Sequence, residues 1–388
     1  MSTTSLPVPE TVPTEAPATT SAVQPVVPDL DRLVVLGQDG NVYTMGRDGG
    51  ERVDLTTDAG TDARYFQPIW SPTGELIAVS ESRADGTVSM STIDLDTGEF
   101  LRSESAAPPF YYSWAPDGER LVYLSGAGQL TLTLIEPGAE GTVIGAGQPF
   151  YFAWHSTAEQ MLVHIGTSRL ELLDITGEIT PIDALPGAFQ APSWQNGVQL
   201  YVRDVGDRQE MVLDEGGDQT VVTTYTTASF FTLSPDGKSV AYRVSGDSDE
   251  GVISAAFRQA TDQLQVFDAA TGTSVAVSDK LVVAFWWSPD SKKLLYLDLL
   301  DSGGLQWHVW DGIESTDHAT FLPSPTFARD FLPFFDQYAL SMTLWSPDSN
   351  AYAFPGVIDS EVGIWVQELG ETEPSLVGDG VFVGWSPR

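Results

Sequence analysis

Five aromatic side chains alternate with charged groups in one stretch near the C-terminus, residues 324–340 (SPTFARDFLPFFDQYAL). Aromatic rings interrupted by a few charges are typical of surfaces that contact proteins or glycans. A long loop can also gather such rings into a small core of its own, and the sequence leaves both interpretations open. The candidate binding residues are Phe327, Arg329, Asp330, Phe331, Phe334, Phe335, Asp336 and Tyr338.

A second stretch, residues 246–262, carries the closely spaced acids Asp247, Asp249 and Glu250. Carboxylate oxygens at such spacing are ligands that Ca²⁺ accepts, so these three are the candidate metal ligands. The distal Glu of a complete calcium loop is missing, and a solvated acidic loop is the simpler interpretation. The sequence therefore predicts no cofactor, with Ca²⁺ as the one ion considered.

Catalytic signatures are absent from the sequence. It contains no G-x-S-x-G elbow, no H-E-x-x-H zinc pair and no Gly-rich phosphate loop. The four histidines fall into two distant pairs, which argues against a shared three-histidine metal site: His155 with His164, and His308 with His318. We therefore predict a non-enzymatic protein with no catalytic residues.

The charge balance narrows the range of partners. Eighteen Lys and Arg face 54 Asp and Glu, a net charge of −36. Nucleic acid and anionic membrane surfaces both require local clusters of cations, so neither is an expected partner. There is no cysteine, which removes disulfides and thiolate chemistry. No apolar run reaches the roughly 18 residues that span a bilayer, so direct membrane insertion is not expected.

A repeat must position these candidate residues. A Trp or Leu followed by a turn and an apolar strand recurs eight times, at spacings of 44, 40, 40, 39, 54, 58 and 40 residues. A period near 40 residues with short β-rich runs is typical of propeller blades. The anchors of the repeat are Trp70, Trp114, Trp154, Trp194, Leu233, Trp287, Trp345 and Trp385.

Each repeat divides into four strands. In the module anchored at Trp114 the expected strands are 110–114, 120–125, 130–136 and 142–145, separated by Gly, Pro and Asp. The Ser-Pro-Asp-Gly turn that follows the anchor suits a type I turn, because Pro presets φ and Gly accepts the last position. We expect the anchor itself to be buried against the neighbouring blade, and helices to be few.

The W-S-P-D-G turn, the apolar strand after it and the following T-G turn resemble the TolB-type, WD40-like β-propeller repeat. The resemblance covers residues 32–388 and is clearest at 70–97, 114–136, 233–271 and 287–311. It departs at 155–159 and 195–197, where the Pro-Asp-Gly turn is lost, and at Leu233, which replaces Trp. The resemblance implies an all-β propeller whose role is recognition more than catalysis.

The two ends of the repeat predict how the propeller closes. Residues 32–57 supply three strands of a blade that lacks its first strand, and the chain ends on a lone first strand, VFVGWSPR. Pairing of these two pieces removes a free edge. We expect eight blades, with seven as the alternative if the modules at Trp194 and Leu233 merge.

The same topology places the two long insertions. Loops after the second and the fourth strand of a blade emerge on one face, because successive strands are antiparallel. The segments 246–262 and 324–340 follow such strands, so we expect both on one face as a binding platform for a protein or a glycan. The alternatives are a Ca²⁺-dependent hydrolase or lyase with carboxylates near the propeller axis, and a structural subunit of a cell-surface assembly.

The N-terminal residues have a different composition. Residues 1–28 contain six Pro and six Thr, with no Lys, Arg or aromatic residue. Such a composition favours an extended, solvated chain. We therefore divide the protein into a disordered tether, residues 1–30, and a propeller domain, residues 31–388. The tether suggests an extracytoplasmic or cell-surface protein held to the envelope by this segment.

Overall fold

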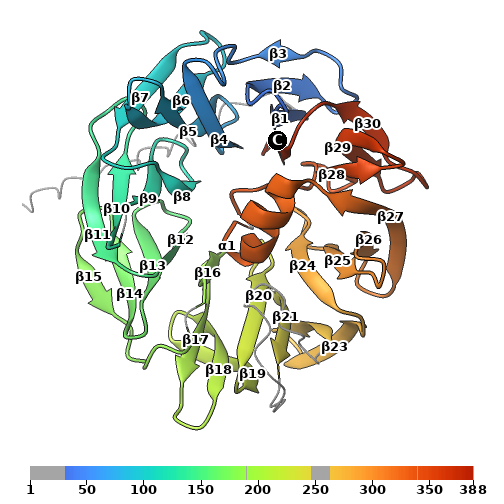
Figure 1. The fold of residues 1–388 in the computed structure, drawn as a ribbon. Helices are drawn as coiled ribbons and strands as arrows, with labels where there is room; N and C mark the ends of the chain where they lie inside the picture. The colour runs from blue at the N-terminus through green and yellow to red at the C-terminus, as the bar shows by residue number, and fades with distance from the viewer. Residues whose placement is uncertain (1–30, 127, 189, 246–262, 339, 388) are drawn as a thin grey trace, which may run out of the picture.

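The fold is described from a computed structural model of the chain, for residues 31–387 apart from 127, 189, 246–262 and 339. The predicted all-β class is confirmed. The described residues form 31 strands, and their helical turns are three short ones between Phe327 and Tyr338. Figure 1 shows the sheets arranged around a common centre, as in a β-propeller. Among these residues no helix is long and apolar enough to cross a membrane.

The strands form seven antiparallel sheets, six of four strands and one of seven. In the first sheet, β31 (Phe382–Trp385) lies beside β1 (Arg32–Leu36), followed by β2 (Val42–Gly46) and β3 (Val53–Asp54). The second contains β4 (Ala63–Trp70), β5 (Leu76–Arg83), β6 (Val88–Asp94) and β7 (Phe100–Glu104). The third contains β8 (Phe110–Trp114), β9 (Leu121–Ser125), β10 (Leu130–Ile135) and β11 (Thr142–Gly147).

The fourth sheet contains β12 (Phe150–Trp154), β13 (Gln160–Ile165), β14 (Arg169–Asp174) and β15 (Ile179–Pro181). The fifth contains β16 (Ser193–Gln195), β17 (Val198–Asp204), β18 (Gln209–Glu215) and β19 (Asp218–Tyr225). The sixth contains β20 (Ala228–Leu233), β21 (Ser239–Ser245), β22 (Leu264–Asp268) and β23 (Thr273–Ser278). The seventh contains β24 (Val282–Trp287), β25 (Leu294–Leu299), β26 (Leu305–Trp310), β27 (Ser315–Pro323), β28 (Ala351–Ile358), β29 (Glu361–Glu368) and β30 (Ser375–Gly378).

The turn after each anchor is built as its composition predicts. In the turn after Trp287, Ser288 Oγ donates to Asp290 Oδ1 at 2.6 Å and accepts from the Lys293 amide at 2.9 Å. Where the Ser-Pro-Asp-Gly sequence is lost, other residues form the turn. His155 Nδ1 lies 2.7 Å from Thr157 Oγ1, and Asn196 adopts a φ of 48°, a conformation that Asn tolerates. The repeat therefore continues through both departures.

The predicted pairing of the two ends of the domain is present. Strand β31 pairs antiparallel with β1, with Leu33 opposite Trp385 and Leu36 opposite Phe382. The amide of Arg32 donates to Ser386 Oγ at 3.1 Å, and the Ser386 amide donates to Arg32 O at 2.8 Å. This first sheet therefore joins the C-terminal strand to the first described residues.

The seven-stranded sheet has a local cause. The module anchored at Trp345 keeps only one bridge of its expected first strand, between Trp345 and Tyr352. Strand β27 reaches across this gap and pairs with β28 through Leu322 with Val357 and Pro323 with Gly356. The sheet is continuous because the residues before Trp345 have left it.

Those residues, 324–344, form what we call the central segment, which contains η1 (Phe327–Phe331), η2 (Leu332–Phe334) and α1 (Phe335–Tyr338). Near its start Ser324 Oγ donates to Val381 O at 3.1 Å, and near its end Thr343 O accepts from the Trp385 amide at 2.7 Å. Val381 immediately precedes β31 and Trp385 is its last residue, so the segment crosses the thickness of the propeller. Figure 1 shows α1 in the space that the sheets surround.

Candidate functional site

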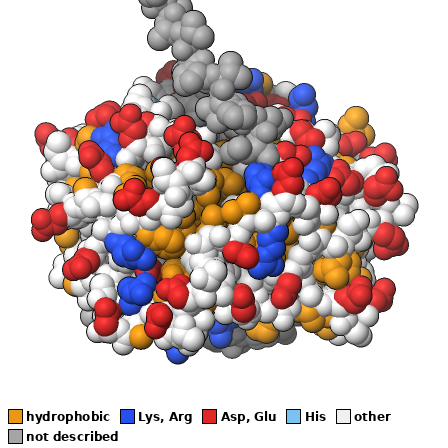
Figure 2. Space-filling view, turned by 90° about the horizontal axis from the view of Figure 1, so that it is seen from above, with side chains coloured by type: hydrophobic (Ala, Val, Ile, Leu, Met, Phe, Trp, Pro, Cys, Tyr) orange, Lys and Arg blue, Asp and Glu red, His pale blue; other side chains and the backbone are white. Residues whose placement is uncertain are grey.

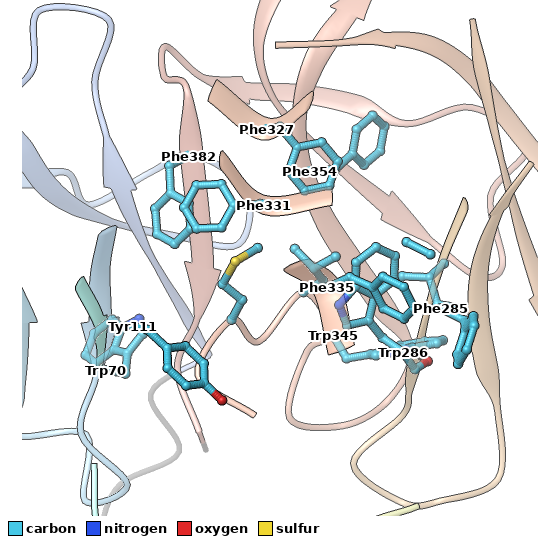
Figure 3. Close-up of a cluster of buried hydrophobic side chains, with 14 of the residues drawn as sticks. Trp70, Tyr111, Phe285, Trp286, Phe327, Phe331, Phe335, Trp345, Phe354 and Phe382 are labelled. Carbon is cyan, nitrogen blue, oxygen red and sulfur yellow. Dashed lines mark hydrogen bonds between the residues drawn. The ribbon is translucent and has the colours of Figure 1, made fainter. Parts of the chain in front are cut away.

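The central segment corrects the predicted binding loop. The side chains of Phe327, Phe331 and Phe335 are buried, at most 2% exposed, and so are not part of a contact surface. The Phe331 ring lies 4.7 Å from that of Phe382 between ring centroids, and Figure 3 shows the two side by side. The physical reason is the missing first strand, which leaves apolar inner strands that these rings cover.

Phe335 packs on the opposite side of the segment. Its ring centroid lies 4.8 Å from that of Phe285 and 5.8 Å from that of Trp286 (Figure 3). Neither earlier interpretation, a surface loop or a loop with its own core, describes this packing. The segment shares the core of the propeller.

Three further predicted residues, Arg329, Asp330 and Phe334, are less buried. Phe334 is 40% exposed. Arg329 is exposed and donates to Asp330 through Nε at 2.8 Å and Nη2 at 2.9 Å. The backbone of Tyr338 ends α1. The predicted residues are thus divided between the core and the surface.

Asp336 is partly buried and accepts a hydrogen bond from Gln190 Nε2, a residue that precedes β16. Burial raises the pKa of its carboxyl group to about 7, because a charge there loses hydration and no cation compensates it. The candidate metal ligands Asp247, Asp249 and Glu250, and the whole stretch 246–262, lie outside the described residues.

A cavity lies where the central segment ends. It borders the turns that follow the anchors Trp70, Trp114, Trp154 and Trp194, and so lies on the face opposite to the one expected for the binding platform. Its volume is about 340 Å³, within the range of sites that hold small ligands or a few residues of a peptide. Three anchors from consecutive blades, Trp114, Trp154 and Trp194, line it together with Tyr111 and Phe152. We call this cavity the tryptophan pocket. Its other lining residues are Pro72, Ser113, Pro116, Ala153, Ser156, Gln195, Asn196, Gln337, Leu340 and Ser341.

The three tryptophans share an unusual property. Each is 6–8% exposed, and each indole Nε1 is buried without a hydrogen-bond partner in the part of the chain that the structure describes. Trp286 and Trp307 also carry such groups, but they do not line this pocket. A buried N–H without an acceptor costs free energy, on the order of 1–3 kcal/mol. The tryptophans that line the pocket therefore carry three buried donors without an acceptor among the described residues.

At other anchors the indole N–H donates to a backbone carbonyl of the neighbouring blade. Trp287 Nε1 donates to Thr232 O at 3.2 Å, Trp345 Nε1 to Trp286 O at 3.2 Å, and Trp70 Nε1 to Gly384 O at 3.3 Å. In each case the acceptor is the carbonyl just before the anchor of the preceding module. By the same rule the Trp154 indole N–H would donate to the backbone carbonyl oxygen of Ser113, and that of Trp194 to the backbone carbonyl oxygen of Ala153. Ser113 and Ala153 instead line the tryptophan pocket.

The pocket also coincides with the altered turns. Ser156 belongs to the first departure, 155–159, and Gln195 and Asn196 to the second. The His155 ring lies 4.4 Å from the Trp194 ring between centroids, so this histidine packs on a wall residue of the pocket. No lining residue among those that the structure describes is charged. The site is therefore suited to a neutral ligand that accepts hydrogen bonds and contacts aromatic rings.

The histidines stay in two separate sheets. His164 is buried, which lowers its pKa, and its Nδ1 lies 3.1 Å from Gln190 O. Burial also lowers the pKa of His318. Among residues 31–387, outside the gaps named above, no group of three or more His, Asp and Glu has the arrangement of a metal site.

Sequence reasoning missed two features. It assigned the tryptophan anchors to the core, and the signal for the pocket was the pair of turn departures beside Trp154 and Trp194. It also missed a buried pair in which His308 Nε2 lies 3.0 Å from Asp298 Oδ2. His308 Nδ1 lies 2.9 Å from Asp317 Oδ1. Antiparallel register brings these three together from β25, β26 and β27, and none of them lines the tryptophan pocket.

Comparison with known proteins supports the fold. No family model matches the chain, and no curated protein matches it. It is similar to a solved structure described as the eukaryotic initiation factor, with 11% identity, a TM-score of 0.57, and coverage of 92% of this chain and 99% of that one. It is similar to the β-propeller domain of the Trilobed protease from Pyrococcus furiosus, with 13% identity, a TM-score of 0.51, and coverage of 82% and 98%.

TolB from Acinetobacter baumannii also matches, with 12% identity, a TM-score of 0.40, and coverage of 92% of this chain and 83% of that one. The match to the β-propeller domain of the Trilobed protease, with its TM-score of 0.51, confirms the resemblance at the level of the β-propeller fold. The matching structures carry descriptions as different as an initiation factor and a protease domain, so the likeness assigns no activity.

Proposed function

We propose that the protein is a non-enzymatic binding platform that recognises a protein or glycan partner through the tryptophan pocket. The observation that carries this proposal is that three tryptophans lining one aromatic cavity have buried indole N–H groups without an acceptor among the described residues. Partner carbonyl or hydroxyl oxygens would accept these hydrogen bonds, while rings or apolar groups would pack against the indoles. The central segment contributes Leu340, which is 52% exposed, to the lining.

The electrostatics support a neutral or basic partner. The net charge is −36, and Figure 2 shows Asp and Glu side chains over the visible surface with few Lys and Arg between them. This distribution repels nucleic acid and anionic lipid. It also supports high solubility of the platform.

The platform would rest on an eight-bladed, closed propeller. The eight repeat anchors support this count, and the pairing of β31 with β1 supports closure. The seven-stranded sheet would then contain two blades, joined because the first strand at Trp345 is reduced to one bridge.

We also propose an extracytoplasmic or cell-surface location with residues 1–30 as an envelope tether. The Pro- and Thr-rich composition of this segment supports the proposal. Two alternatives, a Ca²⁺-dependent lyase or hydrolase and a structural subunit of a surface assembly, stay predictions, because no specific contact among the described residues favours either one.

The test is partner capture from envelope extract with the full chain immobilised. Deleting part of the central segment is unsuitable, because its buried phenylalanines belong to the core. A Leu340→Glu substitution instead places a charge at the rim of an uncharged pocket. We expect it to abolish capture of the partner that the wild-type chain retains, with an unchanged melting temperature.

The matched control is Ile313→Glu, since Ile313 is 90% exposed and does not line the pocket. This variant should capture the partner as the wild type does. Equal capture by wild-type and Leu340→Glu chains would refute the pocket as the recognition site.

A further inference from the structure

The described chain begins at Asp31, which contacts a tryptophan of a cavity next to the tryptophan pocket. Asp31 Oδ1 accepts a hydrogen bond from Trp385 Nε1 at 2.9 Å. Trp385 lines a second cavity of about 220 Å³, which shares Trp114, Leu340 and Ser341 with the tryptophan pocket. The first described residue is therefore in contact with a residue that lines the second cavity.

The sequence just before Asp31 has matching chemistry. Residues 16–28, APATTSAVQPVVP, contain no charged residue, whereas Glu10 and Glu15 lie upstream. The tryptophan pocket likewise has no charged lining residue in the described part of the chain. Docking of this stretch would bury no charge on either side, and so would avoid the desolvation penalty that an acidic segment would incur.

Proline-rich chains supply what the three indoles lack. A polyproline-type chain has no internal hydrogen bonds, so its carbonyl oxygens are free acceptors. Recognition of such chains uses grooves lined by aromatic side chains. Trp114, Trp154 and Trp194 offer both aromatic walls and buried N–H donors.

The reach is sufficient. A polyproline-type chain advances about 3.1 Å per residue, so twelve residues extend about 37 Å. A compact domain of this size has a radius of gyration of about 20 Å. The stretch 16–28 can therefore extend from Asp31 across the face to the tryptophan pocket of the same molecule.

We propose that residues 16–28 dock in the tryptophan pocket of their own chain, with their carbonyl oxygens accepting hydrogen bonds from the indole N–H groups of Trp114, Trp154 and Trp194. The tether is then an intramolecular ligand at an effective concentration in the millimolar range. A partner that uses the same pocket must displace it. The docking itself does not depend on the partner proposed above.

The absence of cysteine allows a clean test on the full chain. A nitroxide attached to Ser21→Cys reports proximity to the indole ¹⁵N–H signals of the 11 tryptophans. We expect the signals of Trp114, Trp154 and Trp194, assigned through single Trp→Phe variants, to lose most of their height relative to the reduced label. The signals of tryptophans in other sheets, such as Trp307 in β26, should keep theirs.

The matched control carries the same label together with Pro17→Ser, Pro25→Ser and Pro28→Ser, all three of which lie outside the described residues. It should restore the three signals. The proposal is overturned if the three signals keep their height in the labelled wild-type tail, or if the control leaves the broadening unchanged. It is also overturned if labelled ¹⁴N chain broadens an unlabelled ¹⁵N chain as strongly, because the occupant would then be a second copy. Failure here leaves the Leu340→Glu capture result untouched, so the two proposals can fail separately.

Discussion

Two regions of the propeller use the same residue in different ways. At Trp70, Trp287 and Trp345 the indole N–H donates to the preceding blade and ties neighbouring first strands together. At Trp114, Trp154 and Trp194 the same atom has no partner among the described residues, and the rings line a cavity. The tryptophan anchor therefore packs between blades in one region and lines a candidate binding site in the other, although the residue type is the same.

The central segment follows the same division. Its Phe335 ring packs against β24, the strand that ends at the tied anchor Trp287. On the other side Gln337 and Leu340 border the tryptophan pocket. The side of the segment with Phe335 therefore contributes to the packed core, and the side with Gln337 and Leu340 borders the open pocket. The predictions below compare the two sides.

The largest effect is expected on the packed side. Phe335→Ala removes a buried ring from contact with Phe285 and Trp286, and should lower the free energy of unfolding by about 3–5 kcal/mol. Urea unfolding followed by tryptophan fluorescence measures this. Phe334→Ala, at a ring that is 40% exposed, should cost less than about 1 kcal/mol. Equal losses from both variants would show that the segment is not packed as described.

A smaller effect is expected at Asp336. Its folded-state pKa of about 7 lies above the ordinary value of 3.8, so the folded protein holds this proton more tightly than the unfolded chain. The contribution of this proton to stability is complete below about pH 4 and is lost as the pH rises toward 7.

Asp336→Asn removes this dependence. Relative to wild type, the variant should gain stability as the pH rises from 4 to 7, because it has no carboxyl group to ionise. We expect a gain on the order of 2 kcal/mol, less than the full pKa shift implies, since the carboxylate is only partly buried. Denaturation midpoints measured across that range provide the check. An Asp207→Asn control at a highly exposed side chain should show no comparable gain, and a flat difference for Asp336→Asn would contradict the assignment.

The smallest effect tests the tryptophans directly. Trp70 and Trp194 are both 8% exposed, but only Trp70 donates to a carbonyl, that of Gly384. Trp→Phe removes the N–H at both positions and changes the ring volume equally. We expect Trp70→Phe to cost about 1 kcal/mol more than Trp194→Phe, because it alone breaks a hydrogen bond and leaves an acceptor unpaired. Equal losses in the free energy of unfolding would show that the hydrogen bond of Trp70 does not distinguish it from Trp194.

The sequence by itself determined the β-propeller fold, the four-strand module and the pairing of the two ends. Local patterns decide these features: strand alternation, turn residues such as Ser288 and Asp290, and the period of the anchors. Only the tertiary structure decided what the residues of 324–340 do. Whether Phe331 covers a core or a partner depends on the space left by the missing first strand before Trp345. It also depends on two rings that are distant in sequence, those of Phe66 at 6.2 Å and Phe382 at 4.7 Å between centroids. The tryptophan pocket has the same origin, since an indole N–H finds its acceptor on another blade, and blade-to-blade geometry is a property of the assembled sheets rather than of any single repeat.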